Sequence, residues 1–278
     1  MTILITGGTG QTGAKLAQLL HNANVDFLIT TRKGIAPEPF KAVQFDWTDA
    51  STFENPFKLA NIDKIYLIAP PVMDALPVMK PFIELAIAKG VKRFVLLCGT
   101  AVGKGGPFVG KVYEYLAQRG VDYDVLRPTW FMENFGTFFY KSIREDNEVF
   151  TVAKDGRVPF VAAEDIAKVA FDVLTADKSS NDECFIIGPE LFSYDEATAL
   201  LSEVLGRKIT HKRVTNAEEQ AIFRANGLKE DYAVLLNTIE ARLADDVDAA
   251  LVGDSKSITG KTKLRDFFEA NKQLWIKA

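Results

Sequence analysis

Three glycines near the start of the chain have the types and spacing needed to bind phosphate. Gly7, Gly10 and Gly13 lie in the run ITGGTGQTG, between a short β-rich run at residues 2–6 and a helical pattern at residues 14–23. Glycine lets the chain turn sharply, lets a ligand approach the backbone and lets a helix pack closely against a sheet. Backbone N–H groups at the start of such a helix attract phosphates. The spacing predicts a dinucleotide pyrophosphate site, although a tight strand-to-helix turn in any α/β protein can use the same residues.

The end of the second expected strand indicates which dinucleotide is preferred. Thr31, Arg32 and Lys33 end the run VDFLITTRK, where proteins that select NAD usually place an acidic residue on the ribose 2′-hydroxyl. Cations and a hydroxyl instead suit a 2′-phosphate, because a guanidinium binds phosphate through two parallel hydrogen bonds. The pattern favours NADP (NADPH), and a solvated basic turn is the structural alternative.

Two further strand ends fit the same ligand. Asp46 and Trp47 offer a carboxylate and an aromatic ring to an adenine, and Ala69 and Pro70 leave little bulk beside a nicotinamide ribose. Asp46 could equally cap a helix that begins near residue 48, and Trp47 could be ordinary core. The residues expected to bind the cofactor are Gly7, Thr9, Gly10, Gln11, Thr12, Gly13, Thr31, Arg32, Lys33, Asp46, Trp47, Ala69, Pro70 and Pro128.

Expected strands and helices alternate along the chain, and these elements must position the residues named above. Near-continuous apolar runs separated by helical patterns are typical of a parallel sheet covered on both faces. The strand-like runs lie at residues 25–32, 41–47, 63–70, 91–99 and 121–128, and the helical patterns near residues 48–60, 74–90 and 109–120. We therefore expect a doubly wound α/β fold of the Rossmann type, with ligands beyond the carboxyl ends of its strands.

The second half of the chain is expected to complete the sheet and cap the substrate cleft. We assign residues 1–150 to the dinucleotide-binding core and residues 151–278 to a smaller, mixed region of the same continuous fold. Asp155-Gly156 predicts a hairpin within residues 147–161, and residues 183–188 predict a late strand of the sheet. Capping-box patterns at Ser193-x-x-Glu196 and Thr215-x-x-Glu218 predict helix starts near residues 194 and 216.

Composition excludes several classes of protein. A chain of 278 residues with 47% apolar residues can bury a substantial core. The net charge of −4 without a basic stripe argues against nucleic acid and membrane surfaces as partners. With two cysteines, two histidines and no C-x-x-C pattern, we expect neither a disulfide framework nor a metal site. The N-terminal run lacks a basic leader, so we expect a cytoplasmic protein, monomeric or homodimeric.

An aromatic stretch follows the expected strand at residues 121–128. Trp130, Phe131 and Asn134 head a series that continues through Phe138, Phe139 and Tyr140. Aromatic faces shelter an apolar polycycle and attract a cation by about 0.5 to 2 kcal/mol per contact. We therefore expect Trp130, Phe131 and Asn134, with Tyr113, to form the catalytic site; the alternative is that these aromatics are helix core.

Longer stretches carry a family resemblance. The opening GGTGQTG, FDW at 45–47, VLRPTWFMENF at 125–135 and VPFVAAEDIAKVA at 158–170 resemble the NmrA-like atypical short-chain dehydrogenases. Within that family the chain is most similar to the ergot alkaloid branch of agroclavine and festuclavine dehydrogenases. The resemblance runs from residue 2 to about residue 211. It implies an NADPH-dependent reductase that acts on the C=N bond of a polycyclic iminium.

The chain departs from ordinary short-chain dehydrogenases in its proton donor. Those enzymes use a tyrosine and a lysine four residues later, whereas Tyr113 is followed there by Ala117, Tyr115 by Arg119 and Tyr123 by Arg127. Hydride addition to an iminium gives a neutral amine and needs no such donor, because the protein has only to align the reactants. Two alternatives stay open: a quinone, carbonyl or enone reductase in which water or Tyr113 supplies the proton, and a non-enzymatic NADP-sensing regulator.

Overall fold

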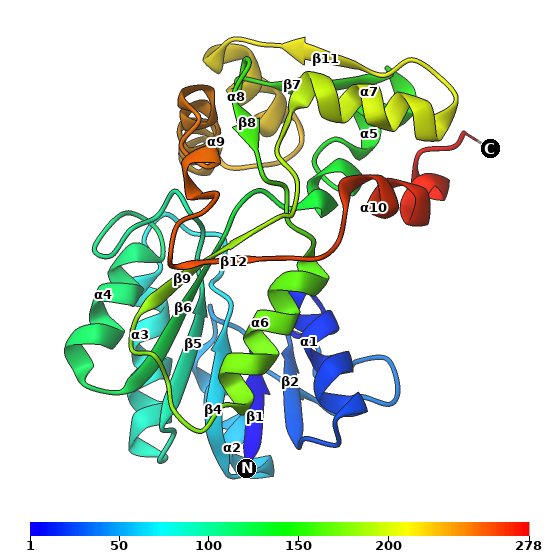
Figure 1. The fold of residues 1–278 in the computed structure, drawn as a ribbon. Coiled ribbons are helices and arrows are strands. Elements are labelled where there is room, and N and C mark those ends of the chain that lie inside the picture. The colour runs from blue at the N-terminus through cyan, green and yellow to red at the C-terminus, as the bar shows by residue number, and fades with distance from the viewer. Residues whose placement is uncertain (278) are drawn as a thin grey trace. The chain divides into compact units, whose positions relative to one another are not determined.

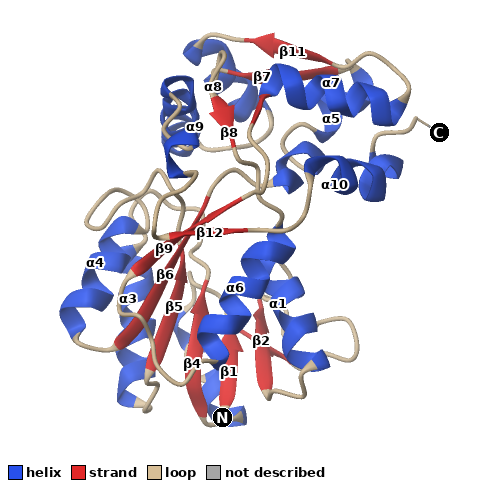
Figure 2. Cartoon of the chain, viewed as in Figure 1, coloured by secondary structure: helices blue, strands red, loops and turns tan. Residues whose placement is uncertain are grey.

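This computed structural model, which describes residues 1–277, contains an eight-stranded sheet in the order β12-β9-β6-β5-β4-β1-β2-β3 (Figures 1 and 2). The doubly wound arrangement is confirmed, because the order runs outward in both directions from β1 and β4 and their pairing is parallel. The strands are β1 Thr2–Ile5, β2 Phe27–Thr31, β3 Ala42–Gln44, β4 Ile62–Leu67, β5 Arg93–Leu97, β6 Asp122–Pro128, β9 Glu183–Ile187 and β12 Ser257–Thr259.

Chain contacts group the residues into two compact units. The first contains residues 1–127 and 166–184, and the second contains residues 128–165 and the chain from residue 185 onward. This grouping differs from a division at residue 150, because the chain leaves the first unit at the end of β6 and returns to it within α6.

The helices of the first unit cover both faces of the sheet. In Figure 1, α1 and α6 lie on one face, and α3 and α4 pack beside each other on the other. The bounds of these helices are α1 Gln11–Asn22, α2 Asn55–Leu59, α3 Leu76–Ala88, α4 Gly110–Arg119 and α6 Ala163–Thr175. The central strands are buried almost throughout, which explains why they read as unbroken apolar runs.

Two basic side chains from the sheet hold the carboxyl end of α6. Lys64 on β4 donates to the carbonyl of Leu174 at 2.6 Å, and Arg93 on β5 donates to the carbonyls of Val173 and Ala176 at 2.9 and 2.8 Å. The last carbonyls of a helix lack partners within the helix and carry partial negative charge. Arg93 is itself 2% exposed, so these carbonyls also give its buried guanidinium hydrogen-bond partners.

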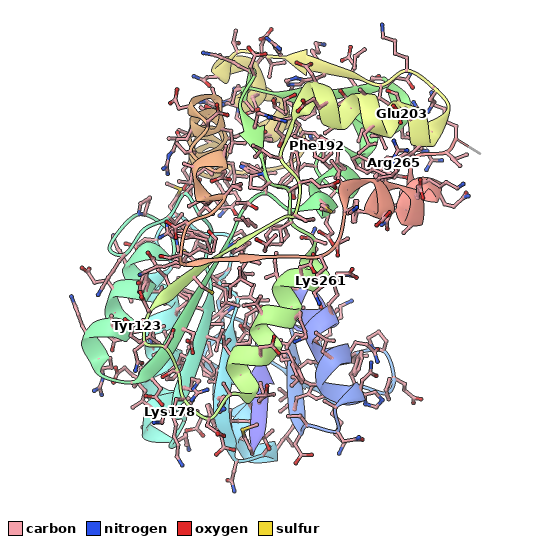
Figure 3. The ribbon with its side chains drawn as sticks, viewed as in Figure 1. Tyr123, Lys178, Phe192, Glu203, Lys261 and Arg265 are labelled. Carbon is pink, nitrogen blue, oxygen red and sulfur yellow. The ribbon has the colours of Figure 1, made fainter. Side chains whose placement is uncertain are left out.

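The second unit is a mixed assembly with small sheets of its own. Its strands pair as β7 Glu148–Thr151 with β11 Thr210–Arg213 in parallel, and β8 Arg157–Val158 with β10 Phe192–Ser193 in antiparallel. Its helices are α5 Tyr140–Glu145, α7 Tyr194–Leu205, α8 Asn216–Ala225, α9 Glu230–Ala241 and α10 Leu264–Asn271. Glu203 on α7 and Arg265 on α10 form an ion pair between two of these helices (Figure 3).

The expected hairpin at residues 147–161 is wrong. β7 takes β11 as its partner and β8 takes β10, so the two strands do not pair with each other. Gly156 is required for a different reason: a Cβ at this position would lie 1.8 Å from the carbonyl oxygen of Leu243. Both capping boxes are confirmed, with Ser193 and Thr215 as the N-cap residues of α7 and α8.

Two buried glutamates join the helices of the second unit. Glu219 on α8 accepts hydrogen bonds from the backbone N–H of Val152 at 3.1 Å and from Asn237 on α9 at 2.8 Å. Glu240 on α9 is 2% exposed, hydrogen-bonds to Glu219, and lies close to the phenol of Tyr194. Burial, and then the neighbouring carboxyl, raises the pKa of Glu240 well above its ordinary value. The pair therefore retains a proton in the folded state.

This retained proton predicts a pH-dependent stability. The unfolded chain releases the same proton above about pH 4.3, so the folded state loses stability as pH rises from that value toward the raised pKa of Glu240. Glu240→Gln cannot ionise, and its stability relative to the wild type should improve by about 1.4 kcal/mol per pH unit through this range. Thermal unfolding between about pH 5 and pH 8 measures the difference. Glu269→Gln, at an exposed site on α10, is the control, and a pH-independent difference for Glu240→Gln would contradict the assignment.

Candidate active site

The turn between β1 and α1 is formed by backbone alone. Gly7 has a φ of +63°, which favours glycine, and its carbonyl oxygen accepts the N–H of Gly10 at 2.9 Å. Gly10 is the N-cap residue of α1 and has no side chain with which to cap the first N–H groups of the helix. A helix start of this kind is an anion site. The turn therefore fits the pyrophosphate of a dinucleotide.

Close packing requires glycine at the other two positions of the turn, Gly8 and Gly13. A Cβ on Gly13 would lie 2.5 Å from the carbonyl oxygen of Gly7, so this glycine lets α1 approach the turn itself. Gly8, which the glycine spacing did not single out, would place a Cβ 2.4 Å from that of Ile29 on β2. The doubled glycine at residues 7 and 8 was the only sequence signal for this contact. By contrast, the nearest atom to a Cβ on Gly10 would be the Gly7 oxygen at 3.2 Å.

The remaining residues of the turn differ in their surroundings. Thr9 and Gln11 are exposed, as expected of residues that contact a ligand. Thr12 is 2% exposed, and its hydroxyl accepts a hydrogen bond from the buried phenol of Tyr66 at 3.2 Å. Its side chain therefore ties α1 to β4.

A tight turn follows β2 and carries the two expected cations. Gly34 has a φ of +69° and donates its N–H to the carbonyl of Thr31 at 3.2 Å. The hydroxyl of Thr31 exchanges hydrogen bonds with the backbone of Ile35 at 3.0 and 3.1 Å. Arg32 and Lys33 are exposed at the head of this turn. The turn therefore fixes the backbone and leaves the cations in solvent at the carboxyl end of β2.

Asp46 and Trp47 both make structural contacts. Asp46 accepts the backbone N–H and the hydroxyl of Thr48, each at 2.8 Å, and these bonds, assisted by Arg32, lower the pKa of its carboxyl. Asp46 thus closes a turn with Thr48, whereas the N-cap of the short helix Ala50–Thr52 that follows is Asp49 rather than Asp46. The indole of Trp47 donates to the carbonyl of Ile68 at 3.2 Å and packs edge-on against Phe45 and Phe82.

The carboxyl end of β4 is tied to that of β1. Thr6 donates its backbone N–H to the carbonyl of Tyr66 at 3.0 Å, and its hydroxyl accepts the N–H of Ile68 at 2.7 Å. Ala69 and Pro70, which follow directly, are half-buried. The strand end proposed for the nicotinamide ribose is therefore fixed beside the glycine turn, within the first unit.

Tyr113 lies in the first turn of α4 and is 5% exposed. Its ring lies 6.0 Å from that of Tyr123, which is near the start of β6 rather than at its carboxyl end. Burial, followed by the negative charge of Glu183, raises the pKa of its phenol well above the ordinary value. The hydroxyl is therefore a weak acid, and its catalytic role stays a prediction.

The aromatic stretch belongs to the second unit, where its side chains divide into buried and half-buried ones. Met132, Phe135 and Phe139 are buried in the aromatic core, whereas Trp130, Phe131 and Asn134 are half-buried, and Pro128 is buried. The carboxylate of Glu133 accepts the backbone N–H of Ala163, the first residue of α6, at 3.0 Å. Glu133 therefore caps a helix, as acidic residues at helix starts commonly do.

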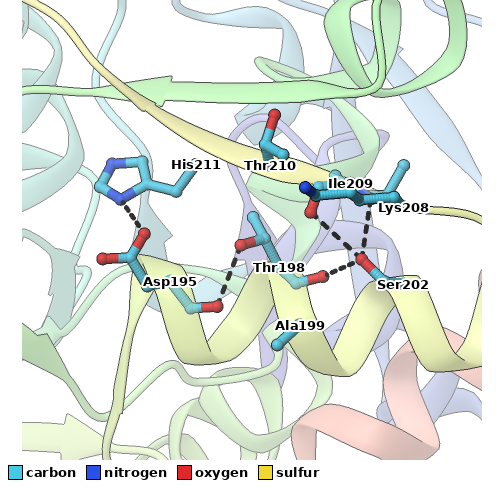
Figure 4. Close-up of a pocket in the computed structure, with 8 residues that line it drawn as sticks. All are labelled: Asp195, Thr198, Ala199, Ser202, Lys208, Ile209, Thr210 and His211. Carbon is cyan, nitrogen blue, oxygen red and sulfur yellow. Dashed lines mark hydrogen bonds and ion pairs between the residues drawn. The ribbon is translucent and has the colours of Figure 1, made fainter.

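A surface hollow of the second unit lies between α7 and β11 (Figure 4). His211 places Nδ1 3.2 Å from Asp195 and Nε2 2.8 Å from the hydroxyl of Thr151, and burial lowers the pKa of its ring. Ser202 donates to Thr198 at 2.7 Å and accepts the N–H of Ile209 at 2.8 Å. These bonds join α7 to β7 and β11, so the polar groups of the hollow serve the fold.

Two searches of residues 1–277 gave negative results. No group of three or more His, Cys, Asp or Glu side chains in this range is placed to hold a metal ion. No helix in the same range has the length and apolar character needed to span a bilayer.

Comparisons with known proteins decide the family. The model of a family described as NAD(P)H-binding matches residues 7–177. Agroclavine dehydrogenase of Claviceps fusiformis is 37% identical, covering 99% of this chain and 99% of that protein. Festuclavine dehydrogenase of Aspergillus fumigatus is 39% identical, covering 100% of both. The chain belongs to the NmrA-like atypical short-chain dehydrogenases.

A solved structure supports the same fold for this NmrA-like protein. An NADPH-dependent quinone oxidoreductase from Escherichia coli has a TM-score of 0.75 at 20% identity, covering 96% of this chain and 98% of that one. At that identity the likeness shows the fold alone. With the family match and the full-length relatives, this NmrA-like protein is an oxidoreductase that binds NAD(P)H.

Gly10 allows dinucleotide binding to be separated from folding. Gly10 has an extended backbone with φ −80° and ψ 179°, which a β-branched residue adopts readily, and its Cβ would have one tight contact, the Gly7 oxygen at 3.2 Å, which a shift of a few tenths of an ångström relieves. Gly10→Val should therefore fold but abolish NADPH binding, because its side chain would occupy the phosphate position. Gly13→Ala, whose Cβ would clash with the Gly7 carbonyl, should also lower the unfolding midpoint. Calorimetric titration and thermal unfolding measure both effects, and unchanged NADPH affinity in Gly10→Val would mean that the phosphates bind elsewhere.

Proposed function

We propose that this enzyme is an NADPH-dependent reductase that transfers hydride to a C=N bond, in an iminium or a similarly activated group, of an apolar, partly aromatic small molecule. The full-length relatives named as agroclavine and festuclavine dehydrogenases support an alkaloid-like substrate class. Bound NADPH supplies the hydride, and the chain supplies binding, orientation and exclusion of water.

The preference for NADPH is supported by the turn after β2. Arg32 and Lys33 are exposed there, on a backbone that Gly34 and the Thr31 hydroxyl fix in a tight turn. A 2′-phosphate gains charge-assisted hydrogen bonds from such a pair, whereas a 2′-hydroxyl would find no carboxylate among residues 30–34.

The surroundings of two polar side chains, Glu133 and Tyr113, support the choice of an iminium. Glu133 is occupied by the start of α6, and burial raises the pKa of Tyr113 while its ring packs on Tyr123. Reduction of a ketone or quinone needs a proton at oxygen, which general acids supply with a gain of about 10² to 10⁴ in rate. An iminium accepts hydride to give a neutral amine, so these residues need supply no proton.

Half-buried aromatic side chains in the second unit support the substrate class. Trp130 and Phe131 are half-buried, although Phe135 next to them is fully buried. An exposed aromatic face can cover an apolar ring system and stabilise a positive charge upon it. Asn134 presents a polar group in the same short segment, and we assign it to orienting the substrate.

Removal of both cations tests cofactor choice. The double variant Arg32→Ala, Lys33→Ala should weaken NADPH binding by a few kcal/mol, because each hydrogen bond to a charged group contributes about 1.5 to 3 kcal/mol. NADH affinity should change little, since its ribose carries no 2′-phosphate. Isothermal titration with both cofactors gives the two affinities. Lys41→Ala, an exposed lysine before β3, is the matched control, and equal losses for NADPH and NADH would refute the assignment.

Tyr113→Phe separates the possible acceptors. With an iminium its single-turnover rate should stay within about tenfold of the wild type, because no enzyme proton is needed. If a ketone or quinone is the true acceptor and Tyr113 its donor, the rate should fall by about 10² or more. The measurement is NADPH oxidation in single turnover with a panel of cyclic iminium ions and quinones. A large defect confined to carbonyl acceptors would overturn the iminium assignment, and tight NADPH binding without any turnover would indicate an NADP sensor.

A further inference from the structure

A buried ion pair lies at the carboxyl end of β6. Arg127 is 8% exposed, and its Nη1 donates to Oε2 of Glu183 on β9 at 2.7 Å. Arg127 also donates from Nε to the carbonyl of Gly99 at 3.3 Å and from Nη2 to the carbonyl of Thr100 at 2.5 Å. The planar guanidinium thus binds one carboxylate and two consecutive backbone carbonyls, a geometry that a lysine cannot reproduce.

The backbone held by Arg127 is the start of a glycine-rich loop. Residues 98–110 connect β5 to α4 and read CGTAVGKGGPFVG. Glycine-rich segments lose the most conformational freedom on ordering, so such a loop needs fixed points. At its far end the N–H of Gly105 donates to Gly110 at 2.8 Å, and a Cβ on Gly110 would lie 2.4 Å from the carbonyl of Gly103. Arg127 provides the fixed point at the near end.

The same loop lies at the edge of the sheet where ligands bind in this fold class. β5 pairs with β4, so residues 98–103 follow the strand end next to Ala69 and Pro70. Neither Gly99 nor Gly103 has a positive φ, and a Cβ on either would meet no atom of residues 1–277 within 4 Å. Neither the backbone angles nor the packing therefore requires glycine at these two positions. Because glycine has no side chain, the main chain there is left accessible to a ligand.

We propose that Arg127 is a positioning residue for the reduction: by holding the carbonyls of Gly99 and Thr100, it fixes the β5–α4 loop as a wall of the cofactor and acceptor site. Glu183 balances the charge of the buried guanidinium, and its contribution is to stability, since an unpaired buried charge is strongly unfavourable. The proposal rests on the proposed function, because it assigns the loop to that reaction.

The test compares two variants that share one change. Glu183→Gln removes the counter-charge, so it should lower the unfolding midpoint, but its amide oxygen can still accept from Arg127 and the hydrogen bonds from Arg127 to the loop are retained. Arg127→Met combined with Glu183→Gln removes those hydrogen bonds and leaves no buried charge. Glu183→Gln should keep a near wild-type rate at saturating NADPH and acceptor. The double variant should lose about ten- to a hundredfold in that rate, as expected for a small misplacement of reacting groups, with NADPH affinity little changed. Arg127→Lys should rescue the rate only in part.

Amide hydrogen exchange in residues 98–104 provides a readout independent of turnover. Exchange there should be faster in the double variant than in Glu183→Gln, and NADPH should slow it in the wild type. If the two variants have equal rates and equal exchange, Arg127 only stabilises the fold. The same conclusion follows if the double variant loses NADPH affinity in parallel with its unfolding midpoint. If the wild type reduces no acceptor, the proposed function fails, but the exchange measurements still test whether Arg127 holds the loop and whether the loop borders bound NADPH.

Discussion

The close approach of backbone to backbone at the start of α1 is the constraint on which the cofactor site depends. Gly13 leaves only 2.5 Å between a would-be Cβ and the Gly7 carbonyl, and Gly8 packs as closely on β2. Because side chains are excluded here, the first turn of α1 and the ends of β1 and β2 are held together at one edge of the sheet. The proposed phosphate binding at the helix start and the proposed 2′-phosphate selection at Arg32 both depend on that arrangement.

The partners of the buried and half-buried carboxyl groups are a second feature of the structure. Several carboxyl groups have structural partners: Glu133 caps α6, Asp46 accepts hydrogen bonds from Thr48, and Glu219 with Glu240 is buried between α8 and α9. A reductase of iminium ions benefits from this distribution, because it requires alignment and shelter from water rather than an acid. The Arg127 contacts add alignment by fixing backbone that glycine would otherwise leave free.

Much of the first unit was predictable, because its strands are buried on both faces and its glycines obey strict steric rules. The glycine turn and the two capping boxes depend on residues close in sequence, and these predictions are reliable for that reason. The hairpin failed because the partner of β7 is β11, about sixty residues later, and local pattern cannot identify such a partner. The roles of Gly8 and Arg127 were missed for the same reason, since Ile29 and Glu183 are distant along the chain.

The most direct test of the account follows the hydride itself. The enzyme is supplied with NADPH in which both hydrogens at C4 of the nicotinamide are deuterium, together with a cyclic iminium bearing a fused aromatic ring, and the product is analysed by mass spectrometry and proton NMR. The account predicts one deuterium on the carbon bonded to nitrogen, with one NADPH consumed per amine formed. Deuterium delivered only to quinone or enone acceptors, or retained entirely in bound cofactor, would contradict it.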